Sequence, residues 1–164
     1  MISYIRFATP IGTLFATSAG AALTGLYFEG GRHAPQIART WIEDPTAAPL
    51  AECAQQVKEF LDGKRERFDL PLAPEGSEFQ RRVWSEIARI PYGETLTYAR
   101  LARRAGAPGA ARAAGAATGR NPLSIIVPCH RVVGTDGSLT GYAGGIERKT
   151  RLLEIEGVLR AAEA

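Results

Sequence analysis

Cysteine and histidine are scarce in this chain, which carries two of each among its 164 residues. Neither a Cys-x2-Cys nor a His-x3–5-His pair occurs, so the spacing typical of structural zinc is absent and we expect no metal site. No apolar run approaches the ~20 residues that span a bilayer, and the first residues lack the pattern of a secretory signal. We therefore expect a cytoplasmic protein with free thiols and no membrane partner.

The charge is uneven along the chain, although its net value of +3 is small. Residues 1–76 hold 7 Lys or Arg against 9 Asp or Glu, whereas residues 77–164 hold 13 against 8. A basic second half favours a polyanionic partner, although an ordinary solvated surface could have the same composition.

The first half reads as strands followed by helices. Short apolar segments separated by turn residues are typical of antiparallel hairpins, and the later segments have helical spacing. We expect strands at residues 2–7, 14–18 and 22–28, and helices at residues 35–43 and 50–61. Cys53 falls on the apolar stripe of the second helix, which predicts a buried structural thiol.

A connector with two prolines, residues 67–75, follows these elements and predicts an extended segment. We place a domain boundary at its end. The first domain would then cover residues 1–76, and the second would cover residues 77–164.

The second domain opens with the spacing of a capping box at Ser77 and Gln80, which predicts a helix to about Ile90. Thr97 is in a position to cap a second, short helix, and a Gly-containing turn at 105–109 follows it.

A further helix is expected at residues 110–119, and it completes a helix-turn-helix pattern. Small residues such as Ala113 and Gly115 let such a helix approach another surface closely, and Arg112 projects near its N-terminal end. The alternative is a packed Ala-rich helix with a merely solvated arginine.

One apolar run, residues 125–133, contains a thiol and an imidazole side by side, Cys129 and His130. A cysteine reacts as the thiolate, and its ordinary pKa near ~8.5 leaves mostly thiol at neutral pH. The adjacent His130 is a candidate base, acting directly or through a water molecule. Pro128 would fix the angle at which the thiol is presented. A buried structural cysteine is the alternative.

The segment Pro128-Cys129-His130-Arg131-Val132 resembles the active-site motif of the O6-alkylguanine-DNA alkyltransferases, and the match continues at 121–122, 141–145 and 155–157. The resemblance implies an α/β fold: an RNase H-like α/β N-terminal domain that acts as a scaffold, and a mainly helical, winged-helix-like domain with a helix-turn-helix. It also implies DNA repair by direct reversal. An alkyl group of O6-alkylguanine, with O4-alkylthymine as a further substrate, would pass irreversibly to the protein's own cysteine.

The same resemblance assigns the chemical roles. Cys129 would accept the alkyl group, while His130 would remove its proton through a water molecule, oriented by Glu156. Asn121 would tie the recognition helix to the active-site loop. The Tyr98 hydroxyl and the Ala143 N–H would stabilise the departing guanine anion. Since nothing in such a site hydrolyses a thioether, each molecule would react once, without a cofactor.

The resemblance also assigns contacts with double-stranded DNA. Arg112 would fill the gap left by the extruded base, Tyr98 would assist extrusion, and Arg120 would contact a phosphate. Ala113 and Gly115 would let the helix enter the minor groove. The remaining pocket residues implied by the resemblance are Val132, Tyr142, Ala143, Gly144 and Gly145. No obligate protein partner is implied.

Three rival functions remain distinguishable. A non-enzymatic alkyl-lesion binder would lack the nucleophile, against which Cys129 argues. A helix-turn-helix transcription factor would bind one undamaged sequence tightly. A Cys-His hydrolase would take its base from a distant part of the chain, where His33 is the one other histidine.

Overall fold

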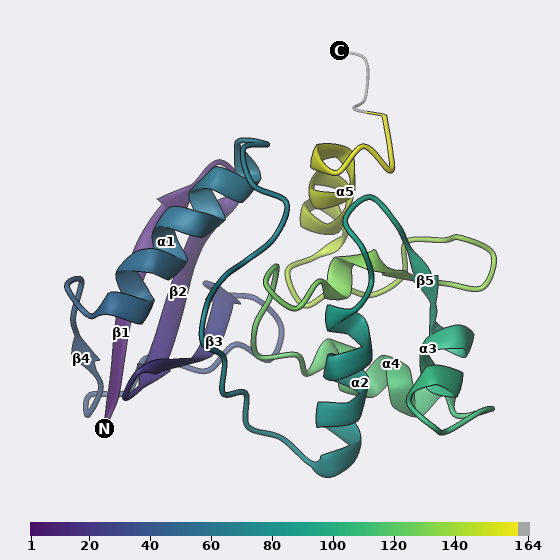
Figure 1. Cartoon of the computed structure of the whole chain (residues 1–164), viewed down its shortest axis with the longest axis horizontal. Coiled ribbons are helices and arrows are strands. Elements are labelled where there is room, and N and C mark those ends of the chain that lie inside the picture. The colour runs from purple at the N-terminus through teal and green to yellow at the C-terminus, as the bar shows by residue number, and fades with distance from the viewer. Residues whose placement is uncertain (161–164) are drawn as a thin grey trace.

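The computed structural model describes residues 1–160. In Figure 1, a sheet and one helix form one side of the molecule, and the remaining helices form the other. Strands β1 (Ile2–Thr9), β2 (Gly12–Ala19) and β3 (Ala22–Phe28) are antiparallel, and β4 (Ile42–Glu43) runs parallel to β1, giving the order β3-β2-β1-β4. The three longer strands confirm the expected hairpins.

Helix α1 (Ala48–Leu61) covers one face of this sheet (Figure 1). It begins with a proline in its first turn, where the missing N–H costs no helical hydrogen bond. Its apolar stripe is buried, and Cys53 lies fully buried on it, as expected.

The helix expected at residues 35–43 is wrong. This segment is irregular and ends in β4, where Ile42 pairs with Ser3 of β1. The segment is mostly exposed, with Ile37 and Trp41 half-buried, so a helix here would bury no continuous apolar face. Pairing with the open edge of β1 satisfies backbone hydrogen-bonding groups of this segment, whereas a short isolated helix here would be only marginally stable.

The connector runs along the outer edge of β3. The Leu23 N–H donates to Pro71 O, and the Ala73 N–H donates to Leu23 O, both at 2.8 Å. Further along the same strand, the Leu26 N–H donates to Pro122 O at 2.8 Å. The last of these contacts joins the two halves of the chain, and a single hydrophobic cluster extends through both.

The second half is mainly helical. Its elements are α2 (Glu78–Ala88), β5 (Leu96–Thr97), α3 (Tyr98–Arg104), α4 (Ala111–Gly119), a 3-10 turn (Cys129–Arg131), β6 (Val132–Val133) and α5 (Ile146–Ile155). The Ser77 capping box and the Thr97 cap are both formed, which confirms these two helix starts. The Trp84 indole donates to Ala117 O at 2.7 Å and thereby joins α2 to α4.

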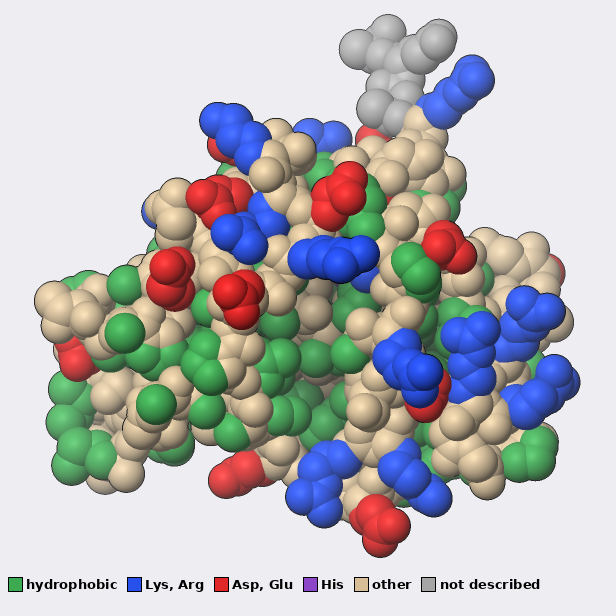
Figure 2. All heavy atoms as spheres, in the orientation of Figure 1, with side chains coloured by type: hydrophobic (Ala, Val, Ile, Leu, Met, Phe, Trp, Pro, Cys, Tyr) green, Lys and Arg blue, Asp and Glu red, His purple; other side chains and the backbone are tan. Residues whose placement is uncertain are grey.

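The surface reflects the uneven charge of the sequence. Figure 2 shows Lys and Arg side chains gathered over the region of α3, whereas the region of α1 carries both signs. Within residues 1–160, no helix is long and apolar enough to cross a membrane.

Candidate active site

Cys129 lies at the start of the 3-10 turn and lines a cavity of about 310 Å³, although the residue is only 4% exposed. The loop that delivers it is unusual, because Ile125 has a φ of +71°, which a β-branched residue rarely adopts. Ile125 is itself buried, so the surrounding packing holds this conformation. The thiol is therefore presented to the cavity by a tightly constrained loop.

His130, Arg131 and Glu156 form one buried hydrogen-bonded group. His130 Nε2 lies 2.5 Å from Glu156 Oε2, and Arg131 Nε donates to both carboxylate oxygens, at 2.8 and 3.1 Å. The Gly93 N–H also donates to Glu156 Oε1, at 2.9 Å. Burial alone would raise the pKa of Glu156, but the hydrogen bonds from His130 and Arg131 hold it below its ordinary value. Glu156 is therefore a carboxylate at neutral pH.

Burial sets the charge of His130, and Glu156 sets which ring nitrogen carries the proton. Burial lowers the pKa of His130 and outweighs the opposing effect of Glu156, so the ring is neutral at pH 7. An ionised carboxylate only accepts hydrogen bonds, so the one ring proton lies on Nε2. Nδ1 then carries the lone pair, and this buried atom has no hydrogen-bond partner within the described residues. The imidazole is thus held as a base with its accepting nitrogen unengaged.

The thiol needs such a base. Burial raises the pKa of Cys129, and the opposing effects of Asn121, Lys149 and Tyr142 reduce this shift without reversing it. Cys129 is consequently a thiol rather than a thiolate at neutral pH.

Lys149 is a site residue that the sequence reasoning missed. Its side chain is buried, and Nζ donates to Val132 O at 2.6 Å, Thr140 O at 3.2 Å and Gly141 O at 3.3 Å. Burial lowers its pKa to about 8, yet it stays charged at pH 7 and lowers the pKa of Cys129. The available signal was its position on the apolar stripe of α5, one turn before Leu152 and Leu153.

Asn121 connects the end of α4 to the loop before the thiol. Its Nδ2 donates to Val127 O at 2.8 Å, and its Oδ1 accepts from the Leu123 N–H at 2.9 Å. The side chain is buried, so both ends of the amide are used. This arrangement couples the position of α4 to that of Cys129.

Two tyrosines line the cavity beside the sulfur. The Tyr98 hydroxyl donates to Thr140 O at 3.2 Å, and the ring lies against Gly115 of α4, where an added Cβ would be 3.7 Å away. The Tyr142 hydroxyl is buried beside Cys129 but reaches full hydrogen-bond geometry with no described group. Burial and the neighbouring thiol raise the pKa of Tyr142 well above its ordinary value.

Apart from Tyr98, which begins α3, the expected DNA-contacting residues lie on α4 or directly after it. Arg112 and Ala113 are exposed, and Arg112 forms no ion pair or side-chain hydrogen bond within residues 1–160. Gly115 faces the cavity, and Arg120 caps the C-terminal end of the helix and also lines the cavity. Because Arg112 lies one helical turn before Gly115 and Ala116, the helix presents an unengaged guanidinium next to the wall of the cavity.

The remaining expected pocket residues divide into two groups. Tyr142 and Ala143 line the cavity. Gly144 packs on Phe28, where a Cβ would come within 2.6 Å of the ring, while Gly145, at φ +91°, precedes α5. Val132 is fully buried in β6. These last three shape the cavity's surroundings without lining it.

Arg131, Arg32 and His33 are further residues that the sequence reasoning did not place. Arg131 lies between Glu156 and the backbone, donating from Nη1 to Ile90 O at 2.7 Å. Arg32 and His33 come from the N-terminal half and line the Cys129 cavity. No local pattern marks any of these roles, since each depends on contacts between distant parts of the chain.

Comparisons with known proteins agree with this geometry. Residues 2–74 match the ribonuclease-like domain of 6-O-methylguanine DNA methyltransferase, and residues 78–158 match its DNA binding domain. The methylated-DNA–protein-cysteine methyltransferase of Mycolicibacterium paratuberculosis is 46% identical over 157 residues, which cover 95% of this chain and 93% of that protein. The protein of the same name from Methanosarcina acetivorans is 42% identical over 154 residues, covering 94% and 97%.

A solved structure also matches closely. The crystal structure of Mycobacterium tuberculosis OGT in complex with DNA superposes with a TM-score of 0.87 at 44% identity, covering 94% of this chain and 92% of that one. The expected α/β fold, with a ribonuclease-like part before a DNA-binding part, is confirmed. The chain belongs to the 6-O-methylguanine DNA methyltransferase family.

Proposed function

We propose that this protein repairs O6-alkylguanine in double-stranded DNA by moving the alkyl group to the sulfur of Cys129. The observation that carries the proposal is the position of this sulfur. It lines a cavity while its neighbour His130 is held neutral, with its accepting nitrogen unengaged. The family of the chain supports DNA repair by methyl transfer, and methyl is the simplest alkyl group in this chemistry.

The first step is proton removal. The Cys129 S–H proton passes through a bridging water molecule to His130 Nδ1, and the Glu156 carboxylate stabilises the resulting imidazolium. Arg131 keeps this carboxylate ionised and in position. Lys149 adds a nearby positive charge that favours the thiolate.

Alkyl transfer follows as a displacement at carbon. The thiolate attacks the alkyl carbon as the bond from that carbon to O6 breaks, and the electron pair stays on the guanine. The Ala143 N–H donates to no group within residues 1–160 and is free to meet the charge on O6. The Tyr98 hydroxyl is the second proposed donor, toward N3. No group in the site can hydrolyse the thioether, so each molecule reacts once, and the step needs no cofactor.

DNA contact is assigned to α4. Exposed Arg112 would stack in the gap left by the extruded base, and Ala113 and Gly115 would allow close approach to the minor groove. Arg120 would contact a phosphate. Residues 77–164 would thus carry the chemistry and these DNA contacts, and residues 1–76 would support them. We place the protein in the cytoplasm, on DNA, because the substrate is found there.

The test is reaction with free O6-benzylguanine followed by intact mass and peptide mapping. We expect a single benzyl group, located on Cys129, and no transfer by Cys129→Ser. Cys53→Ser is the matched control and should react normally, because burial raises the pKa of Cys53 to about 12 and keeps it inert. Benzyl transfer by Cys129→Ser, or a label on Cys53, would contradict the proposal.

A further inference from the structure

A loop from the N-terminal half reaches the mouth of the Cys129 cavity. The Arg32 N–H donates to Ala143 O at 2.8 Å, on the segment whose N–H is proposed to meet the guanine charge. Gly31 makes this approach possible, because a Cβ there would lie only 3.1 Å from Ala143 O and 2.9 Å from Phe28 O. The contact uses the backbone, so the side chains of Arg32 and His33 remain available.

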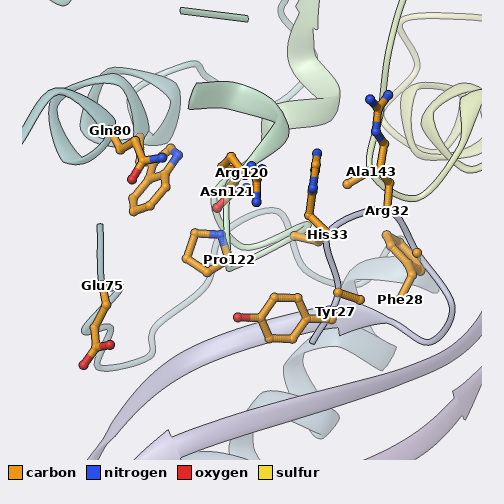
Figure 3. Close-up of a pocket in the computed structure, with 14 residues that line it drawn as sticks. Tyr27, Phe28, Arg32, His33, Glu75, Gln80, Arg120, Asn121, Pro122 and Ala143 are labelled. Atoms are coloured by element: carbon orange, nitrogen blue, oxygen red, sulfur yellow. The ribbon is translucent and has the colours of Figure 1, made fainter. Parts of the chain in front are cut away.

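Three basic side chains meet at this place: Arg32, His33 and, from the end of α4, Arg120. All three are exposed, and all three line both the Cys129 cavity and a neighbouring cavity of about 260 Å³. Figure 3 shows the second cavity, with the His33 ring between Arg120 and Arg32. The loop and the helix thus place a cluster of basic groups at the rim of the reactive site.

This cluster lacks an acidic partner. None of the three forms an ion pair within residues 1–160, and partial burial together with Arg120 and Arg32 lowers the pKa of His33. The carboxylate of Glu75 lines the second cavity but not that of Cys129, and in Figure 3 it lies on the far side from the three. An anion placed among the three would offset the repulsion between Arg32 and Arg120 and would favour protonation of His33.

We propose that Arg32 and His33, together with Arg120, bind a phosphate that flanks the extruded nucleotide. The inference rests on the proposed function. A base seated against Cys129 leaves its sugar and adjoining phosphates at the mouth of the cavity, where these three side chains lie. The N-terminal half would then contact the damaged strand directly, adding a charged contact to its supporting role.

The experiment compares Arg32→Gln with Arg39→Gln in single-turnover repair of an O6-methylguanine duplex at several salt concentrations. Arg39 is exposed on the same segment and lines neither cavity, so both variants lose one charge. Arg32→Gln should raise the duplex concentration for half-maximal rate by roughly fivefold and lower the salt slope by about one, whereas Arg39→Gln should change both much less. Equal effects of the two variants would overturn the proposal, because they would mean that only the net charge of the protein matters.

A neutral methylphosphonate at each phosphate beside the lesion identifies the contact. At one of these positions, the methylphosphonate should raise the duplex concentration for half-maximal rate of the wild type about as much as Arg32→Gln does on the unmodified duplex. For Arg32→Gln, the same methylphosphonate should raise this concentration little further. His33→Asn should show the same pattern with a smaller loss. Fully additive losses at every position would overturn the proposal.

Free O6-benzylguanine separates this inference from the proposed function, because it has no phosphate. The loss caused by Arg32→Gln should be several times larger on duplex than on this compound. An equal loss would mean that the loop shapes the pocket, and the phosphate assignment would fall. Failure of the wild type to react with the compound would instead overturn the proposed function.

Discussion

Glu156 lies 2.5 Å from Nε2 of His130 in the protein interior, although 26 residues separate the two in the sequence. Glu156 directly follows the last turn of α5, where an exposed carboxylate would be ordinary. Burial of this pair, with Arg131 on the same carboxylate, determines which ring nitrogen of His130 carries the proton. The ability of His130 to act as the base therefore depends on one carboxylate.

Replacing this carboxylate should slow the chemistry itself. Glu156→Gln keeps the shape but removes the charge that stabilises the imidazolium, so we expect a loss of about tenfold to a hundredfold. The loss should be similar for an O6-methylguanine duplex and for free O6-benzylguanine. Glu147→Gln, an exposed change on the same helix, is the control. Single-turnover rates that fall on the duplex alone would contradict a role at the nucleophile.

The same pair predicts a loss of stability in acid. The pKa of His130 is lowered from 6.5, so below about pH 6.5 the unfolded chain binds a proton that the folded chain does not. The pKa of Glu156 is lowered from 4.5, so its stabilising effect is present above pH 4.5 and is lost as the pH falls through its folded value. Both groups therefore make the free energy of unfolding fall as the pH falls.

Urea unfolding of the wild type and Glu156→Gln from pH 7 to pH 4 measures this effect. The stability advantage of the wild type should be largest near neutral pH and should shrink below about pH 4.5. A constant difference over this range would mean that folding does not shift the pKa of Glu156, and a difference that grows in acid would mean that Glu156 is not ionised in the folded protein.

Arg112 should matter for extrusion and not for the chemistry. Arg112→Ala should slow repair of duplex DNA by about tenfold to a hundredfold, because unstacking a base costs a few kcal/mol and the arginine offsets part of this cost. Its reaction with free O6-benzylguanine should suffer much less, since no base is extruded. Arg103→Ala, at an exposed position on α3, provides the control. Equal losses on both substrates would show that Arg112 supports the fold or the pocket.

Lys149 should favour the Cys129 thiolate. Removing its charge in Lys149→Met should raise the pKa of Cys129 further and slow its alkylation by iodoacetamide at pH 7 by roughly tenfold. Arg151→Met removes one charge from an exposed position of α5 and should leave the rate nearly unchanged. The pH profile of alkylation is the decisive measurement, since a purely structural role would lower activity without moving the midpoint.

Local patterns in the sequence were sufficient to predict many of the helix starts and strands of this protein. The Ser77 capping box, the Thr97 cap and the strands of the first half depend on neighbours within a few residues, and all formed as expected. The pairing of Cys129 with His130 was also visible, because the two are adjacent. The helix expected at 35–43 did not form, because its apolar residues have no neighbouring surface against which a helix could pack. No local pattern can reveal whether such a surface exists.

Tertiary structure decided how the reactive groups are charged and which segments surround them. The sequence predicts for Lys149 no role beyond its share of the positive charge of the second half, and folding buries it against three carbonyls. Folding likewise brought Arg131 onto Glu156 and carried Arg32 and His33 from the first half to the rim of the Cys129 cavity. The sequence determines which side chains are available, but burial and long-range contacts set their pKa values, because desolvation and nearby charges exist only once distant segments pack together.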